Sequence, residues 1–317
     1  MKSNNRESLN LLRSAMKNRI PSYISGPAGS GKTTLVKNLA KDLKLKYYSI
    51  SVCSQTTVSA IFGFVDASGH YRPSLFRLAY EYGGVFLMDE LDAGNANTIS
   101  AINQAIENGI CGFPDGKMVD AHPDFVFCAS GNTVGTGANK KYIGRNPLDG
   151  ASLDRLAFIE WEYDEELELQ ISSNPYWVKR VQAYRLIANQ LGIGLIISPR
   201  ASKNGSKLIN DGIPLHLVEK TVIFKGQVDK ATQEKLIAQV NAYLNYNTVI
   251  PVTETVVVEN RTERQTKPTE KPTEKPKKRT RRKGGKLNLS PEERQRRSDR
   301  MKKIHSDRKV RLFAIAV

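Results

Sequence analysis

Short apolar runs alternate with amphipathic segments along the first 160 residues. The runs are a few residues long and rich in β-branched and aromatic side chains, which is typical of buried strands. They cover residues 23–25, 47–52, 85–88, 125–130 and 158–161, with helical patterns between them near 33–44, 73–82 and 95–107. Strands that alternate with helices predict an α/β fold, in which helices flank both faces of a mainly parallel sheet.

The pattern changes twice further along the chain. Strand patterns fade after residue 162, and amphipathic segments such as 176–191 and 201–209 predict a small all-α domain at 163–250. Before them, residues 1–20 predict one short helix with Leu9, Leu12 and Met16 at core spacing, so the α/β core should cover 1–162. After them, the repeat KPTEKPTEKP at 267–276 has nothing apolar to bury.

We therefore expect a disordered basic C-terminal tail made of two parts. Residues 251–289 should be a linker rich in Pro, Lys and Glu that ends in a basic cluster. Residues 290–317 should form a basic helix, because Ser290 and Pro291 provide a helix start and Glu293 completes a capping box.

Charge is concentrated in this tail. Residues 261–317 hold 21 lysines and arginines against 7 aspartates and glutamates, out of 48 and 32 in the whole chain. A net charge of +14 on a flexible segment is typical of non-specific nucleic-acid binding, here through residues 277–311. The alternative is a solvated tail that aids solubility or contacts an acidic protein.

Composition excludes several classes of protein. No run approaches the roughly 18 apolar residues of a membrane span, and the polar start lacks a secretory pattern. The three cysteines show no CxxC spacing, and the four histidines are scattered. We therefore expect a cytoplasmic protein with reduced thiols, with Cys128 buried in a strand, and with no catalytic metal beyond Mg²⁺.

A glycine-rich loop carries the strongest chemical signal. Residues 26–33 read GPAGSGKT and fit G-x-x-x-x-G-K-[ST] between a strand and a helix. Such a loop cradles phosphates with backbone N–H groups, while Lys32 reaches the β- and γ-phosphates and Thr33 coordinates Mg²⁺. The predicted ATP-binding residues are Gly26, Pro27, Ala28, Gly29, Ser30, Gly31, Lys32, Thr33 and Thr34.

An acidic pair follows the apolar strand at 85–88. Asp89 and Glu90 should lie at the carboxyl edge of the sheet, where ligands of such sheets bind. Asp89 would hold Mg²⁺ through a water molecule, and Glu90 would polarise the attacking water.

Together these residues resemble an AAA+ ATPase of the MoxR-like group, which includes dynein-related modules and the small ATPase subunit of cobaltochelatase. Five segments carry the resemblance: GPAGSGKTTL at 26–35, residues 63–92 ending in FLMDELD, the hairpin-like segment at 109–132, GASLDRL at 150–156 and SPRAS at 198–202. The resemblance implies an AAA+ core, a helical lid at 163–250 and a ring of identical chains, expected to be a hexamer.

The resemblance also implies roles for further polar residues. Asn132 would orient the lytic water, and Arg200 would couple the lid to the nucleotide. Arg155 would be the finger that one chain presents to its neighbour's ATP, with Arg145 as the rival. Two insertions would face the pore or a partner, so Phe64, Tyr71 and Lys117 are candidate substrate contacts.

The leading hypothesis is an ATP-hydrolysing motor that remodels or loads a partner protein, such as one with a von Willebrand A-type domain. One alternative is an ATP-driven module in DNA or RNA transactions, tethered by the basic tail. Another is a nucleotide-dependent scaffold, which the joint presence of Glu90, Asn132 and Arg155 disfavours.

Overall fold

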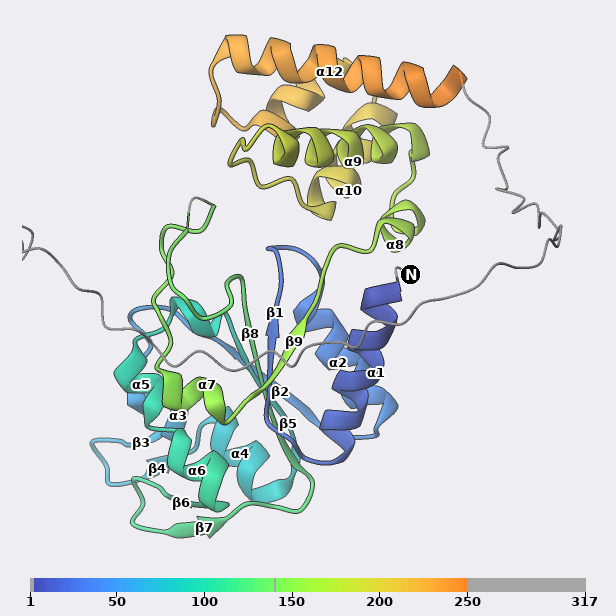
Figure 1. Cartoon of the computed structure of the whole chain (residues 1–317). Helices are drawn as coiled ribbons and strands as arrows, with labels where there is room; N and C mark the ends of the chain where they lie inside the picture. The colour runs from blue at the N-terminus through green and yellow to red at the C-terminus, as the bar shows by residue number, and fades with distance from the viewer. Residues whose placement is uncertain (1–2, 140, 250–317) are drawn as a thin grey trace, which may run out of the picture. The chain divides into compact units, whose positions relative to one another are not determined.

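The structure is a computed structural model that describes residues 3–139 and 141–249 (Figure 1). All of them belong to one unit of the chain, Met1–Thr253. The predicted linker at 251–289 and the predicted basic helix at 290–317 lie outside the described residues, so both remain predictions.

Five parallel strands form the central sheet, in the order β2-β5-β8-β1-β9. Each strand of the sequence pattern is present, within one or two residues at either end. The strands are β1 (Ser22–Ser25), β2 (Tyr47–Ser51), β5 (Gly84–Asp89), β8 (Phe125–Gly131) and β9 (Ala157–Glu160). Because the strands are parallel, their carboxyl ends meet at one edge of the sheet.

Helices cover both faces of this sheet, as Figure 1 shows. In β5, Val85 and Leu87 pack on one face with α1 (Ser3–Lys17) and α2 (Lys32–Asp42), in a core that also contains Cys128. Burial raises the pKa of the Cys128 thiol to about 12.

Phe86 and Met88 alternate to the opposite face of β5, as a period of two requires. They pack in a second core with Phe76 and Tyr80 of α4 (Leu75–Tyr82) and Ile61 of α3 (Val58–Phe62). The predicted α/β fold with a parallel sheet between helices is thus confirmed.

One predicted helix is interrupted. The segment expected to be helical near 95–107 forms α5 (Ala96–Ser100) and α6 (Asn103–Asn108). At the junction the N–H of Ile102 bonds the carbonyl of Ile99, three residues back, and both side chains are buried in the same core. This three-residue hydrogen bond forms a tighter turn that separates the two helices.

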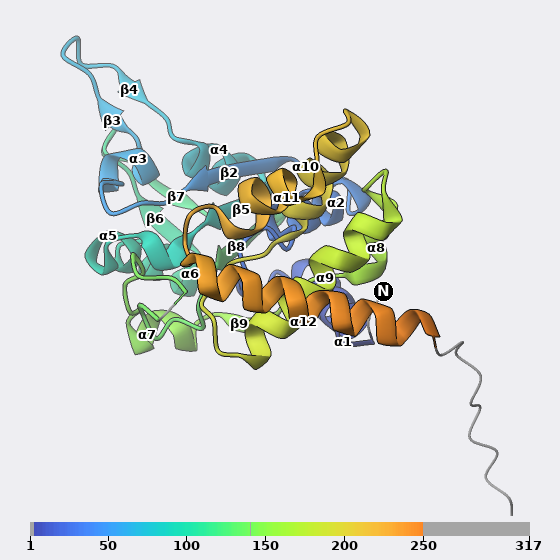
Figure 2. The ribbon, with the colours of Figure 1, turned by 90° about the horizontal axis from the view of Figure 1, so that it is seen from above.

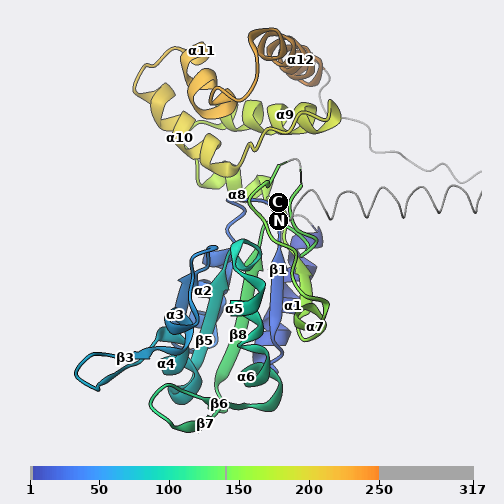
Figure 3. The ribbon, with the colours of Figure 1, turned by 90° about the vertical axis from the view of Figure 1, so that its left-hand side faces the viewer.

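Two antiparallel hairpins extend from the core (Figures 2 and 3). One joins β3 (Phe64–Val65) to β4 (Tyr71–Arg72), and the other joins β6 (Ile110–Gly112) to β7 (Met118–Asp120). Phe64 is half exposed, whereas the Tyr71 hydroxyl donates a 2.6 Å hydrogen bond to the Phe62 carbonyl. Of the candidate substrate contacts, Phe64 and Lys117 are exposed, and Tyr71 anchors its own hairpin.

The remaining described elements are helical. After η1 (Leu91–Ala93) and α7 (Gly150–Asp154) in the core come α8 (Glu165–Gln170), α9 (Pro175–Gln190), α10 (Pro199–Asn210), α11 (Leu215–Val218), the π-helical turn η2 (Glu219–Phe224) and α12 (Lys230–Val249). Trp177, Tyr184 and Phe224 form the centre of a separate apolar core. No helix in the described part of the chain is long and apolar enough to span a membrane.

Candidate active site

The glycine-rich loop joins β1 to α2 at the carboxyl edge of the sheet. Gly29 and Gly31 have φ angles of 76° and 89°, in the left-handed region that favours glycine. At Gly26 a side chain is excluded by contact, because an added Cβ would lie 2.0 Å from the Trp161 carbonyl oxygen. The positive φ angles and the close approach of Trp161 therefore let the loop curl tightly at this edge of the sheet.

Lys32 is the buried cation of this loop. Its Nζ donates to the carbonyls of Gly26 (2.7 Å) and Pro27 (3.1 Å) and to Asn132 Oδ1 (3.0 Å). Burial lowers its pKa to about 8, and the nearby Asp89 carboxylate partly opposes this shift. The ammonium thus lies in a polar cradle that phosphate oxygens could share.

The Thr33 hydroxyl and the Asp89 carboxylate are oxygen groups that could bind a metal ion. The Thr33 hydroxyl donates to Asp89 Oδ2 at 2.6 Å, and the Ser130 hydroxyl donates to Asp89 Oδ1. Hydroxyl and carboxylate oxygens are the hard ligands that Mg²⁺ prefers. In the described part of the chain no group of three or more His, Cys, Asp or Glu side chains could hold a metal ion.

A polar cavity of about 290 Å³ brings most of the predicted site residues together. Its lining comes from the glycine-rich loop, the acidic pair, the end of β8 and α10. The lining residues are Ala28, Gly29, Gly31, Lys32, Thr33, Thr34, Asp89, Glu90, Gly131, Asn132 and Arg200. Glu90 enters it from a strained backbone, with φ of 58° in a non-glycine residue. We call this space the phosphate cavity.

A second cavity of about 550 Å³ adjoins the same loop and also contacts Gly29, Gly31 and Thr34. It is lined by Ser30 and, on its apolar side, by Leu9 of α1, Leu35 of α2, Trp161, and Leu167 and Ile171 near α8. We call it the apolar cavity. A nucleotide with phosphates in the phosphate cavity could place its base here.

The two candidate finger residues lie elsewhere. Arg155, at the end of α7, pairs with Glu107 at 2.8 Å from Nε and does not line the phosphate cavity. Arg145 Nη1 lies 3.2 Å from Asp92 Oδ1 and 3.5 Å from Glu90 Oε2 of its own chain. The structure thus gives the two arginines different surroundings.

Asp92 was not singled out from the sequence. It is fully buried, and its Oδ2 accepts hydrogen bonds from the N–H groups of Asn132 and Thr133 and from the Thr133 hydroxyl, each at 2.9 Å. It therefore fixes the turn that presents Asn132. The sequence contained one indication of its importance. Asp92 follows Asp89 by three residues in the segment DELD, where the end of a strand does not require a third acidic residue.

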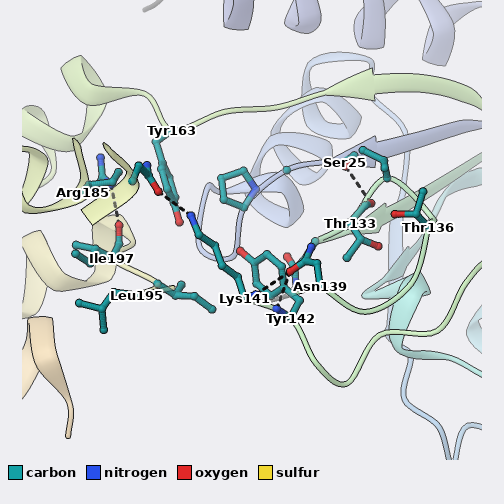
Figure 4. A pocket seen from close by; sticks show the side chains of 16 residues that line it. Ser25, Thr133, Thr136, Asn139, Lys141, Tyr142, Tyr163, Arg185, Leu195 and Ile197 are labelled. Atoms are coloured by element: carbon teal, nitrogen blue, oxygen red, sulfur yellow. Dashed lines mark hydrogen bonds between the residues drawn. The ribbon is translucent and has the colours of Figure 1, made fainter. Parts of the chain in front are cut away.

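Two tyrosines hold the outer side of the loop. The Ala28 N–H donates to Tyr142 Oη at 2.9 Å, and the Tyr163 hydroxyl donates to the Ala28 carbonyl at 2.8 Å. Both tyrosines line a third cavity of about 340 Å³, shown in Figure 4. There Lys141 Nζ also donates to Asn189 Oδ1 of α9 at 2.7 Å. The segment after Asn132 thus contacts both the loop and the helical region.

Comparison with known proteins gives a family and distant relatives. Residues 21–156 match the AAA domain of the dynein-related subfamily. Protein CbbQ of Hydrogenophilus thermoluteolus is 25% identical over 224 residues, which are 66% of this chain and 82% of CbbQ. An uncharacterised protein of Staphylococcus epidermidis is 23% identical over 150 residues, 44% of this chain and 54% of that protein.

Midasin of Giardia intestinalis is 26% identical over 150 residues, 45% of this chain and 3% of midasin. The chain thus spans about half the length of the staphylococcal relative and a small part of midasin. The matched residues run from just before β1 to just after α7 and contain every residue of the phosphate cavity except Arg200. The predicted resemblance is therefore confirmed: residues 21–156 match an AAA domain of the dynein-related subfamily, and the chain is similar to MoxR-like AAA+ proteins.

Proposed function

We propose that this chain binds ATP with Mg²⁺ at the phosphate cavity and hydrolyses it. One observation carries the proposal: Lys32, Thr33, Asp89, Glu90, Asn132 and Arg200, from four separate segments, line the same cavity. A site that only bound nucleotide would need the loop and its lysine. The additional carboxylate and amide match the groups that place a lytic water.

Each residue has a separate task in this proposal. Lys32 and the loop N–H groups hold the phosphates, and Thr33 and Asp89 hold Mg²⁺, which supplies charge neutralisation on the phosphate oxygens. The Glu90 carboxylate accepts a hydrogen bond from the attacking water, and Asn132 orients that water. Arg200, on α10, is the contact through which the helical region senses the nucleotide.

The apolar cavity is the proposed site for the base. Its wall of leucine, isoleucine and tryptophan side chains matches the face of a purine, while the shared residues Gly29, Gly31 and Thr34 connect it to the phosphate cavity. Adenine could therefore bury its ring there without moving the phosphates from the loop.

We further propose that the motor works as a cytoplasmic ring, expected to be a hexamer, which remodels or loads a partner protein. The position of Arg155 supports the ring, because it lies outside the phosphate cavity of its own chain and so could serve a neighbour's. The exposed Phe64 and Lys117 on the two hairpins are candidate contacts for a partner, such as one with a von Willebrand A-type domain. We also propose that the α/β core ends at residue 162 and that the helical lid covers residues 163–250.

A pair of substitutions tests hydrolysis directly. Lys32→Ala should abolish ATP binding, because it removes the cation of the loop. Glu90→Gln should keep ATP binding and stop phosphate release, because the amide cannot accept the water's proton. Nucleotide affinity and phosphate release would be measured for both, and equal loss of binding in the two variants would refute these roles. The Glu90→Gln chain, which should retain ATP and partner together, would also serve to capture the partner.

Nucleic acid is the second candidate partner. The observation that favours it is the charge of +14 on residues 261–317, with 27 basic against 25 acidic residues in the rest of the chain. Counterion release would give such a segment affinity for DNA or RNA without sequence preference.

A further inference from the structure

Arg145 contacts the carboxylates of its own chain. Its Nη1 lies 3.2 Å from Asp92 Oδ1 and 3.5 Å from Glu90 Oε2, and its side chain is 13% exposed. The two acids follow the strand β5, whereas Arg145 comes more than fifty residues later, so the tertiary fold creates this cluster.

Asp92 is the fixed member of the cluster. Three donors from Asn132 and Thr133 occupy its Oδ2, which leaves Oδ1 for the guanidinium. The residue after Arg145 is hydrogen-bonded to η1, the short helical turn that carries Asp92. The Asn146 N–H donates to the Asp92 carbonyl at 2.7 Å, and Asn146 Nδ2 donates to the Gly94 carbonyl at 2.9 Å. Arg145 therefore has an anchored side chain on an anchored backbone.

Glu90 is the adjustable member. Its side chain is 48% exposed, and its left-handed backbone directs it from the end of β5 toward the phosphate cavity. An exposed carboxylate on a turn has several rotamers, and only some of them would reach a water beside the γ-phosphate. The guanidinium at 3.5 Å is a long but direct electrostatic restraint on this side chain.

We propose that Arg145 is a positioning residue that acts in cis: anchored by Asp92, it holds the Glu90 carboxylate in the orientation required for catalysis. This proposal rests on the hydrolysis proposed above. It differs from the finger role implied by the family resemblance, in which Arg145 would leave its own chain's acids to contact a neighbour's ATP. Such a departure would leave the fully buried Asp92 without its cation, which is costly in a buried ion pair.

Arg155 provides the contrast within the same chain. Its partner Glu107 is 54% exposed, so water can replace the arginine when it turns toward another chain. We therefore expect Arg155 to act in trans and Arg145 to act in cis.

A double-mutant cycle between Arg145 and Glu90 tests the proposal. Loss of a general base costs about 10²–10⁴-fold in rate, so loss of its positioning alone should cost less. Arg145→Ala should lower kcat about tenfold or more, with ATP affinity and KM within about twofold of the parent chain. In the Glu90→Ala background, Arg145→Ala should cause almost no further loss, because the group it positions is gone.

Arg145→Lys is the conservative variant. It keeps a cation near Asp92 and should recover part of the lost kcat. Thermal unfolding of the parent, Arg145→Ala and Arg145→Lys chains would show whether folding is intact. If the Arg145→Ala chain does not fold, Arg145→Gln replaces it, because the glutamine retains a hydrogen-bond donor for Asp92.

Mixed assemblies separate cis from trans action. If Arg145 acts in cis, mixing Arg145→Ala chains with Lys32→Ala chains restores nothing, because no chain then has both an intact loop and its own Arg145. The matched control mixes Arg155→Ala with Lys32→Ala, and these assemblies should regain activity at the interfaces that join an intact loop to an intact Arg155.

Four results would overturn the cis assignment: recovery in the Arg145 mixture, an equal further loss in the Glu90→Ala background, a rise in activity of Arg145→Ala, or loss of ATP binding by Arg145→Ala. Failure of the underlying hydrolysis is distinguishable, because it would show in the unmodified chain as absence of phosphate release despite nucleotide binding.

Discussion

The hydroxyl of Thr33 donates a 2.6 Å hydrogen bond to Asp89 Oδ2, and this bond joins the start of α2 to the end of β5 across 56 residues of sequence. The Asp89 carboxylate is held on its other oxygen by the Ser130 hydroxyl of β8. Side chains from two other elements, α2 and β8, thus orient the carboxylate at the end of β5.

This relationship predicts the effect of Asp89→Asn. The amide preserves the size of the side chain and an oxygen for the Thr33 hydroxyl, but it removes the charge that binds Mg²⁺. We expect the chain to fold and to bind ATP, while turnover falls about a hundredfold and requires more Mg²⁺. Phosphate release would be measured across a Mg²⁺ titration, and an unchanged Mg²⁺ requirement would argue against Asp89 as a metal ligand.

The buried Lys32 predicts a pH dependence of ATP binding. Because its pKa in the free chain is about 8, the ammonium loses its proton as pH rises through that value. Phosphates in the cavity would stabilise the charged form, so binding above pH 8 must take up a proton and the association constant should fall about tenfold per pH unit. Calorimetry in buffers of different ionisation enthalpy would detect the proton uptake.

Lys32→Arg is the control for this pH dependence, since a guanidinium keeps its charge over the same range. Its ATP affinity can be weaker throughout, but it should not change with pH near 8. The same pH profile in both chains would assign the titration to another group.

The apolar cavity predicts a separation of base and phosphate recognition. Leu167→Glu places a charge beside the proposed base site without touching the loop. ATP affinity should fall at least about tenfold, because a buried purine face would meet a carboxylate, whereas inorganic triphosphate should bind as before. If both ligands weaken equally, the base does not occupy this cavity.

Gly131 predicts a packing conflict with Tyr23. An added Cβ at Gly131 would lie 1.9 Å from Tyr23 Oη, whose hydroxyl donates to the Thr133 carbonyl at 2.8 Å. Gly131→Ala should destabilise the fold by about 1–3 kcal/mol, measured by denaturant unfolding. Removal of the hydroxyl eliminates this shortest contact and leaves the one of 2.8 Å to Tyr23 Cζ, so Tyr23→Phe combined with Gly131→Ala should cost less than the sum of the two single changes.

The basic tail predicts binding that depends on salt. Residues 1–317 should bind DNA or RNA of any sequence more tightly than residues 1–260, and the affinity of the full chain should fall linearly with salt on logarithmic axes. Equal binding by the two chains, or binding that ignores salt, would leave the tail as a solubilising segment or a contact for an acidic protein.

Local patterns in the sequence predicted the five strands of the central sheet and most of the helices, and they also singled out the loop and the acidic pair that line the phosphate cavity. Strand and helix periods come from neighbouring residues, so the five strands and the order of the helices followed from apolar spacing. The loop at 26–33 could be identified for the same reason, because its glycines, lysine and threonine are adjacent in sequence. Asp89 and Glu90 followed from their place after a buried strand.

Tertiary structure alone decided which charges meet. Arg145 and Arg155 are both arginines in polar segments, and nothing local distinguishes them, yet one contacts the buried Asp92 and the other the exposed Glu107. The burial of Asp92 likewise depends on β5 and β8 lying side by side, which brings the Asn132 turn over its carboxylate. Pairings of this kind join segments that are far apart in the chain, so their geometry is determined by how the sheet and its loops pack together and not by the spacing of residues along the sequence.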